Sequence, residues 1–247
     1  MSKKLLARNV SKNFGGVQAL LDVSLDVQED SIVGLIGSNG SGKTTLVHII
    51  TGVLKPDSGS VFVGDTEITG WRTDRIAALG VGRTFQIARL FNSLSVGENV
   101  ELGVMSVSNG EDVDNKVNQL LNRLNIDKWA SEQASSLPYG VMRRLEIARA
   151  LGIRPKFLLL DEPAAGLNED EAYELLEIIK GINKDPKFGC GILIIDHNPR
   201  LILNLCDRIH VLDKGETIAE GTPEEIRHDS KVIEAYLGKK YASDKNS

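Results

Sequence analysis

The sequence has little of what would mark a secreted, membrane-spanning or nucleic-acid-binding chain. Its two cysteines, Cys190 and Cys206, have no C-x-x-C spacing, so we expect reduced core or surface thiols in a cytosolic protein. Residues 1–8 are basic but no apolar run follows them, so no signal peptide is expected. No segment approaches the ~20 apolar residues that a membrane-spanning helix needs. The 34 acidic and 29 basic residues give a net charge of −5, which makes no electrostatic case for nucleic acid.

The remaining composition is ordinary. The 247 residues suffice for one large domain or two small ones, and 41% hydrophobic and 26% charged residues are typical of a soluble globular protein. There is no internal repeat, and low complexity is confined to the polar tail after Gly238.

What the sequence does contain is a G-x-x-x-x-G-K-[ST] loop at residues 37–44. The apolar, β-branched run before it (32–36) predicts a buried strand, and the run after it (45–50) predicts a helix, which is the context that this motif requires. Glycines let backbone N–H groups turn toward phosphate oxygens, and the helix N-terminus adds partial positive charge. Lys43 would reach the β- and γ-phosphates, and the Thr44 hydroxyl would hold Mg²⁺. The predicted nucleoside triphosphate site comprises Gly37, Ser38, Asn39, Gly40, Ser41, Gly42, Lys43 and Thr44.

A second motif is the apolar run 157–160 followed by Asp161 and Glu162. Such a run is typical of a parallel strand buried on both faces, and its carboxyl end lies at the ligand edge of the sheet. Asp161 would then bind the Mg²⁺ shell through water, and Glu162 would act as the general base toward an attacking water. The alternative is an ordinary strand-to-loop transition, but the phosphate loop upstream favours the site.

Three further residues are candidates from their positions. Gln86 is the last residue of a predicted strand at 81–86, and His197 follows the predicted strand 191–195, where it would hydrogen-bond a γ-phosphate. A purely structural histidine is the alternative for His197. Phe14 lies in a predicted loop at residues 10–16, where an exposed ring would stack on adenine; a core phenylalanine is the alternative, which the residue type alone favours.

Hydrophobic spacing predicts the rest of the organisation. The alternation at 20–27 predicts a half-buried strand within a β-rich N-terminal region, and apolar residues at helical spacing from 117 to 124 predict a small helical subdomain. The last helix of that subdomain would have Ser136 or Leu137 near its N-cap and Pro138 in its first turn. Capping boxes predict helices starting after Asn168, with a stop at Gly181, and after residue 222.

Taken in order, these motifs resemble the nucleotide-binding domain of ABC transporters over nearly the whole chain. The resemblance implies an α/β P-loop NTPase fold with a RecA-like core, an N-terminal antiparallel β region and an inserted α-helical subdomain. It further implies a single ABC ATPase domain over 1–247. The β region and core would occupy about 1–86 and 153–247, and the helical subdomain about 87–152.

The resemblance also implies roles for individual residues. Residues 37–45, now including Thr45, match the Walker A loop, and Phe14 sits where the family stacks an aromatic on adenine. Gln86 matches the glutamine that touches Mg²⁺ and the attacking water, and His197 matches the switch histidine. Asp161 and Glu162 match Walker B and the catalytic glutamate, and residues 165–168 match the D-loop. In this family two domains pair head to tail, so that the signature helix of one meets the ATP of the other.

The signature segment at 137–141 departs from the usual Leu-Ser-Gly-Gly-Gln. Pro138 replaces the serine, Tyr139 the first glycine and Val141 the glutamine. Proline offers neither a hydroxyl nor an N–H group to a phosphate. We therefore expect the contact with the partner's nucleotide to be made at Tyr139 and Gly140, through the Gly140 backbone and the helix dipole.

Finer motifs are similar to the ATPases of branched-chain amino acid importers; they lie at 82–86, 89–91, 139–140, 143–149, 161–168, 221–227 and 235–238. Urea and short-amide importers carry similar motifs and stay open as alternatives. The resemblance implies ATP and Mg²⁺ as cofactors, integral-membrane permease subunits as partners, and pairing as a homodimer or with a sister ATPase. It implies the cytoplasmic face of the cell membrane as the location and no nucleic acid partner.

Two other functions are compatible with the motifs. A soluble ABC ATPase of DNA repair or translation usually carries a long coiled-coil insertion or a second nucleotide domain, but only about 50 residues separate Gln86 from Gly140. A nucleotide-gated interaction module with little catalysis is the other alternative, which the altered signature keeps open.

Overall fold

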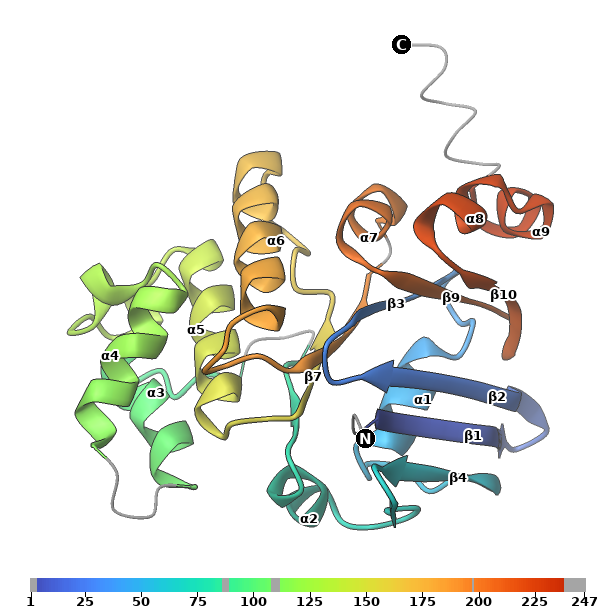
Figure 1. Cartoon of the computed structure of the whole chain (residues 1–247), viewed down its shortest axis with the longest axis horizontal. Helices are drawn as coiled ribbons and strands as arrows, with labels where there is room; N and C mark the ends of the chain where they lie inside the picture. The colour runs from blue at the N-terminus through green and yellow to red at the C-terminus, as the bar shows by residue number, and fades with distance from the viewer. Residues whose placement is uncertain (1–3, 86–88, 108–111, 197, 238–247) are drawn as a thin grey trace.

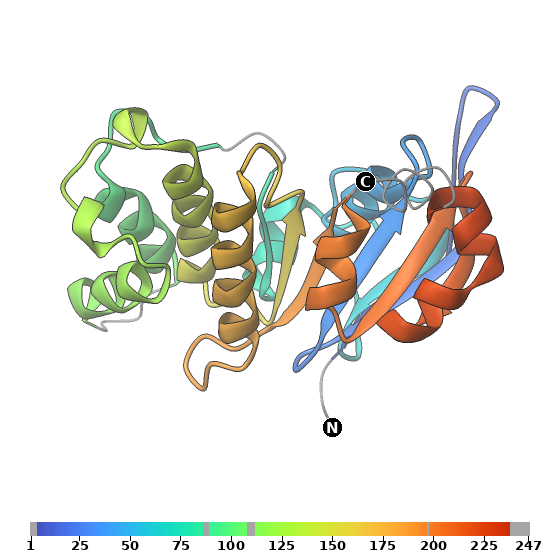
Figure 2. The same cartoon turned by 90° about the horizontal axis from the view of Figure 1, so that it is seen from above.

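The computed structural model describes residues 4–85, 89–107, 112–196 and 198–237, which form two sheets and the helices around them (Figure 1). The strands occupy one end of the molecule. Helices α3 (Val96–Met105), α4 (Val113–Arg123) and α5 (Tyr139–Gly152) pack together at the other end, as the view from above also shows (Figure 2). This helical group lies within residues 87–152, where the sequence predicted helices.

The larger sheet of the described chain has six strands in the order β10-β9-β3-β8-β7-β6. All neighbours are parallel except β10 and β9, which are antiparallel. The predicted strands at 32–36, 157–160 and 191–195 are confirmed. The six strands are β3 (Ile32–Gly37), β6 (Val81–Arg83), β7 (Phe157–Asp161), β8 (Gly191–Ile195), β9 (Arg208–Asp213) and β10 (Glu216–Gly221).

The smaller sheet of the described chain is antiparallel, in the order β2-β1-β4-β5. Its strands are β1 (Lys4–Phe14), β2 (Val17–Gln28), β4 (Ser58–Val63) and β5 (Thr66–Glu67). The predicted loop at 10–16 is wrong, because β1 continues to Phe14 and only the turn at Gly15 and Gly16 leaves the ladder. The end of this hairpin pairs Asn13 with Gln18, so its polar residues lack the apolar alternation that indicates a strand.

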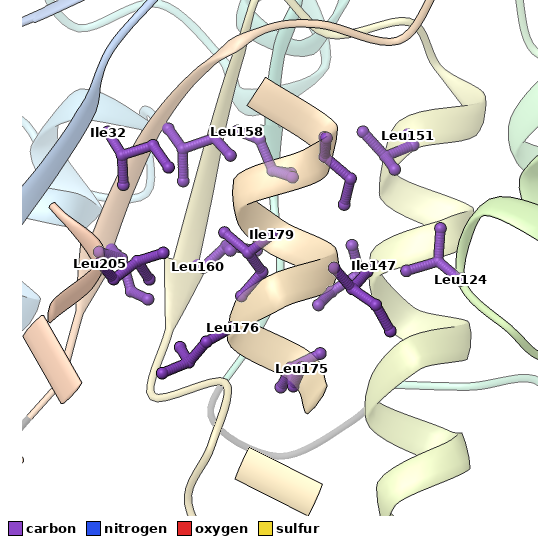
Figure 3. Close-up of a cluster of buried hydrophobic side chains, with 14 of the residues drawn as sticks. Ile32, Leu124, Ile147, Leu151, Leu158, Leu160, Leu175, Leu176, Ile179 and Leu205 are labelled. Atoms are coloured by element: carbon purple, nitrogen blue, oxygen red, sulfur yellow. The ribbon is translucent and has the colours of Figure 1, made fainter. Parts of the chain in front are cut away.

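Both faces of the larger sheet are buried, because successive residues of a strand point to opposite sides. In β7, Leu158 and Leu160 join the cluster that packs against α5 and α6 (Figure 3). Phe157 and Leu159 point the other way, into a cluster that contains residues of both sheets and of α1 (Lys43–Ile50). Continuous apolar runs such as 157–160 are therefore what this sheet requires.

Helices α6 (Glu169–Asn183), α7 (Pro199–Leu205), α8 (Pro223–His228) and α9 (Ser230–Val232) follow the later strands, and α2 (Thr73–Ala78) precedes β6. Short 3-10 turns lie at Asp127–Trp129 and Ala134–Ser136. Helix α9 is followed by a π turn at Ile233–Leu237. Both predicted capping boxes are confirmed, at Asn168 with Glu171 and at Thr222 with Glu225. No helix in the described ranges is long and apolar enough to cross a membrane.

Two helix boundaries differ from the prediction. Helix α6 passes through Gly181 and ends at Asn183, because this glycine makes room for the Arg123 side chain: a Cβ there would lie 2.1 Å from Arg123 Nη2. Pro138 is the N-cap of α5 and not part of its first turn. Its carbonyl oxygen accepts from the N–H of Met142 at 3.0 Å.

Candidate nucleotide-binding site

The glycine-rich loop joins β3 to α1, the strand–loop–helix context that the sequence predicted. Gly42 is the N-cap of α1 with a φ of 104°, a left-handed backbone that glycine adopts without strain. A Cβ at Gly42 would lie 2.6 Å from the carbonyl oxygen of Ala19, so the loop also packs tightly on β2. The first N–H groups of α1 are thereby presented at a helix N-terminus, where an anion is stabilised.

Lys43 lies folded against this loop. Only 8% of the residue is exposed, and its ammonium donates to the carbonyl oxygens of Gly37 and Ser38, each at 2.9 Å. Burial lowers the pKa of Lys43, while the nearby carboxylates of Glu162 and Asp161 oppose this shift. The lysine therefore remains close to both acids that the sequence singled out.

A cleft of about 400 Å³ brings the two motifs together. Asp161 at the end of β7 and Glu162 after it line the cleft together with the loop, although more than a hundred residues separate them from it in the sequence. Of the predicted loop residues, Gly37 and Ser38 do not line the cleft. The lining residues are Ala19, Asn39, Gly40, Ser41, Gly42, Lys43, Thr44, Thr45, Asp161, Glu162 and Ile195.

Asp161 is held by its neighbours on β6. Arg83 Nη2 lies 3.1 Å from Asp161 Oδ2, and the side chains of this ion pair are only 8% and 11% exposed, respectively. The backbone N–H of Asp161 also donates to Thr84 Oγ1 at 3.3 Å. Arg83 and Thr84 were not predicted as site residues. The sequence shows only a basic residue at the end of a short predicted strand, and the pairing of that strand with β7 is a tertiary feature.

Glu162 has an unusual backbone. Its φ is 47°, in the left-handed region, a conformation that costs a residue other than glycine about 1–3 kcal/mol. Its N–H donates to the carbonyl oxygen of Ile195 at 2.8 Å, which ties the turn after β7 to the end of β8. Strain of this kind is common where a side chain must be aimed at a ligand.

The donors in the cleft fit an ATP-bound magnesium ion. Mg²⁺ prefers hard oxygen ligands and is usually held by one or two protein side chains together with substrate phosphates and water. The Thr44 hydroxyl and the Asp161 carboxylate both line the cleft. Within the described residues no group of three or more His, Cys, Asp or Glu side chains forms a dedicated metal cage.

Several predicted residues do not line this cleft. Phe14 ends β1 opposite Val17, and 45% of the residue is exposed, so the core alternative is wrong. Lys12 Nζ lies 5.6 Å from the centre of its ring. Gln86 and His197 lie outside the described residues. The residue before His197, Asp196, is buried and accepts from the N–H of Asn198 at 2.8 Å.

Tyr139 and Gly140 begin α5, away from the cleft lining of their own chain. Tyr139 is 44% exposed, with the Arg143 guanidinium 5.1 Å from the centre of its ring. A Cβ at Gly140 would lie 3.2 Å from Glu171 Oε1, so the signature segment packs against the start of α6. The Tyr139 ring is therefore at the surface, whereas Gly140 is buried.

A larger hollow of about 680 Å³ lies between β6 and the helical group. Its wall includes Arg83, Phe85, Arg89, Phe91, Glu146 and Arg149, so aromatic rings and guanidinium groups alternate around it. The buried Glu146 accepts from the backbone N–H of Phe85 at 2.9 Å, and Arg143 donates to the Phe85 carbonyl oxygen at 3.2 Å. Burial raises the pKa of Glu146, against the opposing effects of these two partners.

Comparison with known proteins assigns the class. Residues 20–165 match the family model described as "ABC transporter". The chain is 31% identical to the ATP-binding cassette MJ1267 in its ADP conformation, with a TM-score of 0.87 over 96% of this chain and 100% of that one. A dimeric cassette, MJ0796, matches at 25% identity and a TM-score of 0.78, covering 89% of this chain and 98% of that one. The chain therefore belongs to the ABC transporter ATP-binding family, and it is an ATP-binding ATP hydrolase.

More specific similarities are found within this family. Residues 216–242 match a model described as "Branched-chain amino acid ATP-binding cassette transporter". The high-affinity branched-chain amino acid transport ATP-binding protein LivG of Salmonella typhimurium is 41% identical, over 96% of this chain and 99% of the relative. The lipopolysaccharide export system ATP-binding protein LptB of Escherichia coli is 37% identical, over 96% of this chain and 98% of the relative.

Proposed function

We propose that this chain is the ATPase subunit of an ABC importer for branched-chain amino acids, attached to the cytoplasmic face of the cell membrane through its permease. The observation that carries the proposal is the match of residues 216–242 to a branched-chain amino acid transporter model. The ABC core alone would not discriminate, since an export ATPase is 37% identical to the same chain.

In the proposed hydrolysis, Glu162 polarises a water and takes its proton as that water attacks the γ-phosphate. Lys43 and the α1 N-terminus bind the phosphate oxygens, and the whole predicted loop with Thr45 cradles them. Gln86 and His197 would orient the water and the γ-phosphate. Thr44, Gln86 and Asp161 would hold Mg²⁺, which neutralises charge on the phosphates.

The start of α5 supports the proposal of a head-to-tail pair of ATPases. Tyr139 and Gly140 do not line the cleft of their own chain, and the Tyr139 ring is 44% exposed, which would let this end of the helix meet the nucleotide of a second chain. Without the serine, the Gly140 backbone and the α5 N-terminus would supply the contact. The partner would be a second copy of this chain or a sister ATPase.

The hollow between β6 and the helical group is the proposed docking site for the permease. It presents exposed apolar surface, such as Phe91 and Leu102, next to the cations Arg89 and Arg149. Motion of the helical group with nucleotide binding would then be passed to the membrane subunits. We also propose that the chain is a single domain, in which the helical group is an internal subdomain.

Isolation from gently solubilised native membranes tests this function. The proposal predicts that the chain is recovered with two permease subunits and with a second ATPase or copy of itself, and that the reconstituted complex takes up leucine, isoleucine or valine only with ATP. Uptake of urea or a short amide in their place would assign the alternative substrate. Recovery from the soluble fraction without permeases would contradict the transport function.

A further inference from the structure

Arg83 lies between the nucleotide cleft and the hollow beside the helical group. It ends β6, its side chain is 8% exposed, and its Nη2 lies 3.1 Å from Asp161 Oδ2. Its Nη1 lies 3.3 Å from the hydroxyl of Thr51, the C-cap of α1. One guanidinium therefore joins the acidic end of β7 to the helix that follows the phosphate loop.

On its other side, Arg83 lines the hollow between β6 and the helical group, the proposed permease docking site, which we call the groove. Arg83 lines that groove, while its partner Asp161 lines the nucleotide cleft. The Arg83 guanidinium is 4.9 Å from the centre of the Phe85 ring, and the Arg89 guanidinium is 4.3 Å from the same centre. A group that enters the groove against Phe85 or Arg89 thus presses on the residues that surround Arg83.

We propose that Arg83 is a positioning residue that holds the Asp161 carboxylate for magnesium and makes its orientation depend on occupation of the groove. The dependence on occupation of the groove rests on the proposed function, whereas the positioning of Asp161 by Arg83 does not. Arg83 acts through Asp161 and touches neither nucleotide nor metal in this role.

The physical basis is the burial of the pair. A carboxylate that is almost fully removed from water depends on its cation, so Asp161 follows any displacement of Arg83. The planar guanidinium fork also serves Thr51 and Asp161 at once, which a lysine ammonium cannot reproduce with the same geometry. Residues that orient a metal ligand in this way typically change metal affinity by about 10–100-fold when they are removed.

The first test measures magnesium linkage in the isolated full-length chain by calorimetric titration with ADP. The linkage is the dissociation constant in EDTA divided by that in Mg²⁺. We expect Arg83→Met to lower this ratio about tenfold, as for removal of other metal-orienting partners, with Arg83→Lys intermediate. Arg83→Gln, which keeps a donor for Thr51, replaces Arg83→Met if circular dichroism shows that the latter does not fold.

The matched control is Arg123→Met. Arg123 forms another partly buried pair, with Nε 3.1 Å from Asp185 Oδ2, and neither residue lines the nucleotide cleft or the groove. We expect Arg123→Met to lower the stability of the protein but to leave the magnesium linkage at its wild-type value. A wild-type ratio in folded Arg83→Met or Arg83→Gln would overturn the positioning role.

The second test measures coupling in the reconstituted transporter at saturating Mg²⁺. The quantity is the ATPase rate with permease divided by the rate of the ATPase alone, and we expect Arg83→Met to lower it about fivefold or more, within the usual range of coupling between sites. If Arg83→Met leaves the stimulation of ATPase activity by the permease unchanged, the proposed dependence of Asp161 on the groove is overturned. Absence of stimulation in the wild-type complex would instead contradict the proposed function, and the magnesium linkage would still decide the role of Arg83 at Asp161.

Discussion

Lys43 Nζ lies 2.9 Å from the carbonyl oxygen of Gly37, so the lysine braces the loop from which it projects. The Lys43→Ala variant removes both this brace and the charge that would meet the phosphates. We expect its affinity for ADP to fall at least about tenfold, the effect of losing one strong charge-assisted contact. Calorimetric titration with Mg²⁺ present measures it.

The control for this prediction is Lys55→Ala, which removes an exposed lysine outside the cleft. It should bind ADP like the wild type. Unchanged ADP affinity and unchanged ATP turnover in Lys43→Ala would contradict the use of the loop proposed above.

Glu162 provides a test of catalysis without binding. The Glu162→Gln side chain keeps the size of the original but has no basic carboxylate, so we expect ATP hydrolysis to fall about 10²-fold or more while ATP still binds. Phosphate release and nucleotide binding, measured on the same preparation, separate the two effects. Turnover close to that of the wild type would remove Glu162 from the base role. Glu169→Gln, in the first turn of α6, is a control that neutralises a nearby acid outside the cleft lining.

Much of the site was predictable because each motif is local. The glycines and Lys43 lie within one loop, and the acids follow one apolar strand, so sequence spacing suffices to place them at strand ends. Arg83 was missed because its ion pair joins residues that meet only when β6 pairs with β7. No local pattern encodes which strand lies beside which.

The wrong predictions about the fold arose because they, too, relied on local sequence patterns. Gly181 was predicted as a helix stop, but it lies inside α6 because the Arg123 side chain crosses it on the way to Asp185. That reason is tertiary. Residues 10–14 were predicted as a loop because an exposed hairpin carries polar residues on both faces, which removes the alternation used to detect strands.

Phe14 remains to be tested as an adenine contact. Its ring is exposed at the end of β1, and Ala19 on the same hairpin lines the cleft. If the ring stacks on adenine, Phe14→Ala should weaken ATP binding about fivefold or more, since base–aromatic stacking contributes about 1–3 kcal/mol, and Phe14→Tyr should retain the affinity. Val17→Ala is the matched control, because Val17 pairs with Phe14 across the turn and is 69% exposed. Equal affinities for Phe14→Ala and Val17→Ala would leave Phe14 without a nucleotide contact.

The buried His210 should make the stability of the protein depend on pH. This residue on β9 is 1% exposed, and its Nε2 lies 3.3 Å from Glu220 Oε1. Burial, assisted by the charge of Arg208 and opposed by Asp26, lowers the pKa of His210 from 6.5 to about 4. As the pH falls through this interval the unfolded chain takes up a proton that the folded chain does not, so the free energy of unfolding decreases.

The loss from His210 should begin near pH 6.5 and reach about 3 kcal/mol near pH 4, at about 1.36 kcal/mol for each unit of pKa difference. Urea unfolding of wild type and His210→Leu at pH 7, 6 and 5 measures it, since the carboxylates common to both largely cancel in the difference. The wild type should lose stability relative to His210→Leu as the pH falls. His228→Leu, which removes an exposed histidine of α8, is the control for loss of a histidine outside the core. Parallel curves for His210→Leu and wild type would mean that the buried imidazole accepts a proton in the folded state as readily as in the unfolded chain.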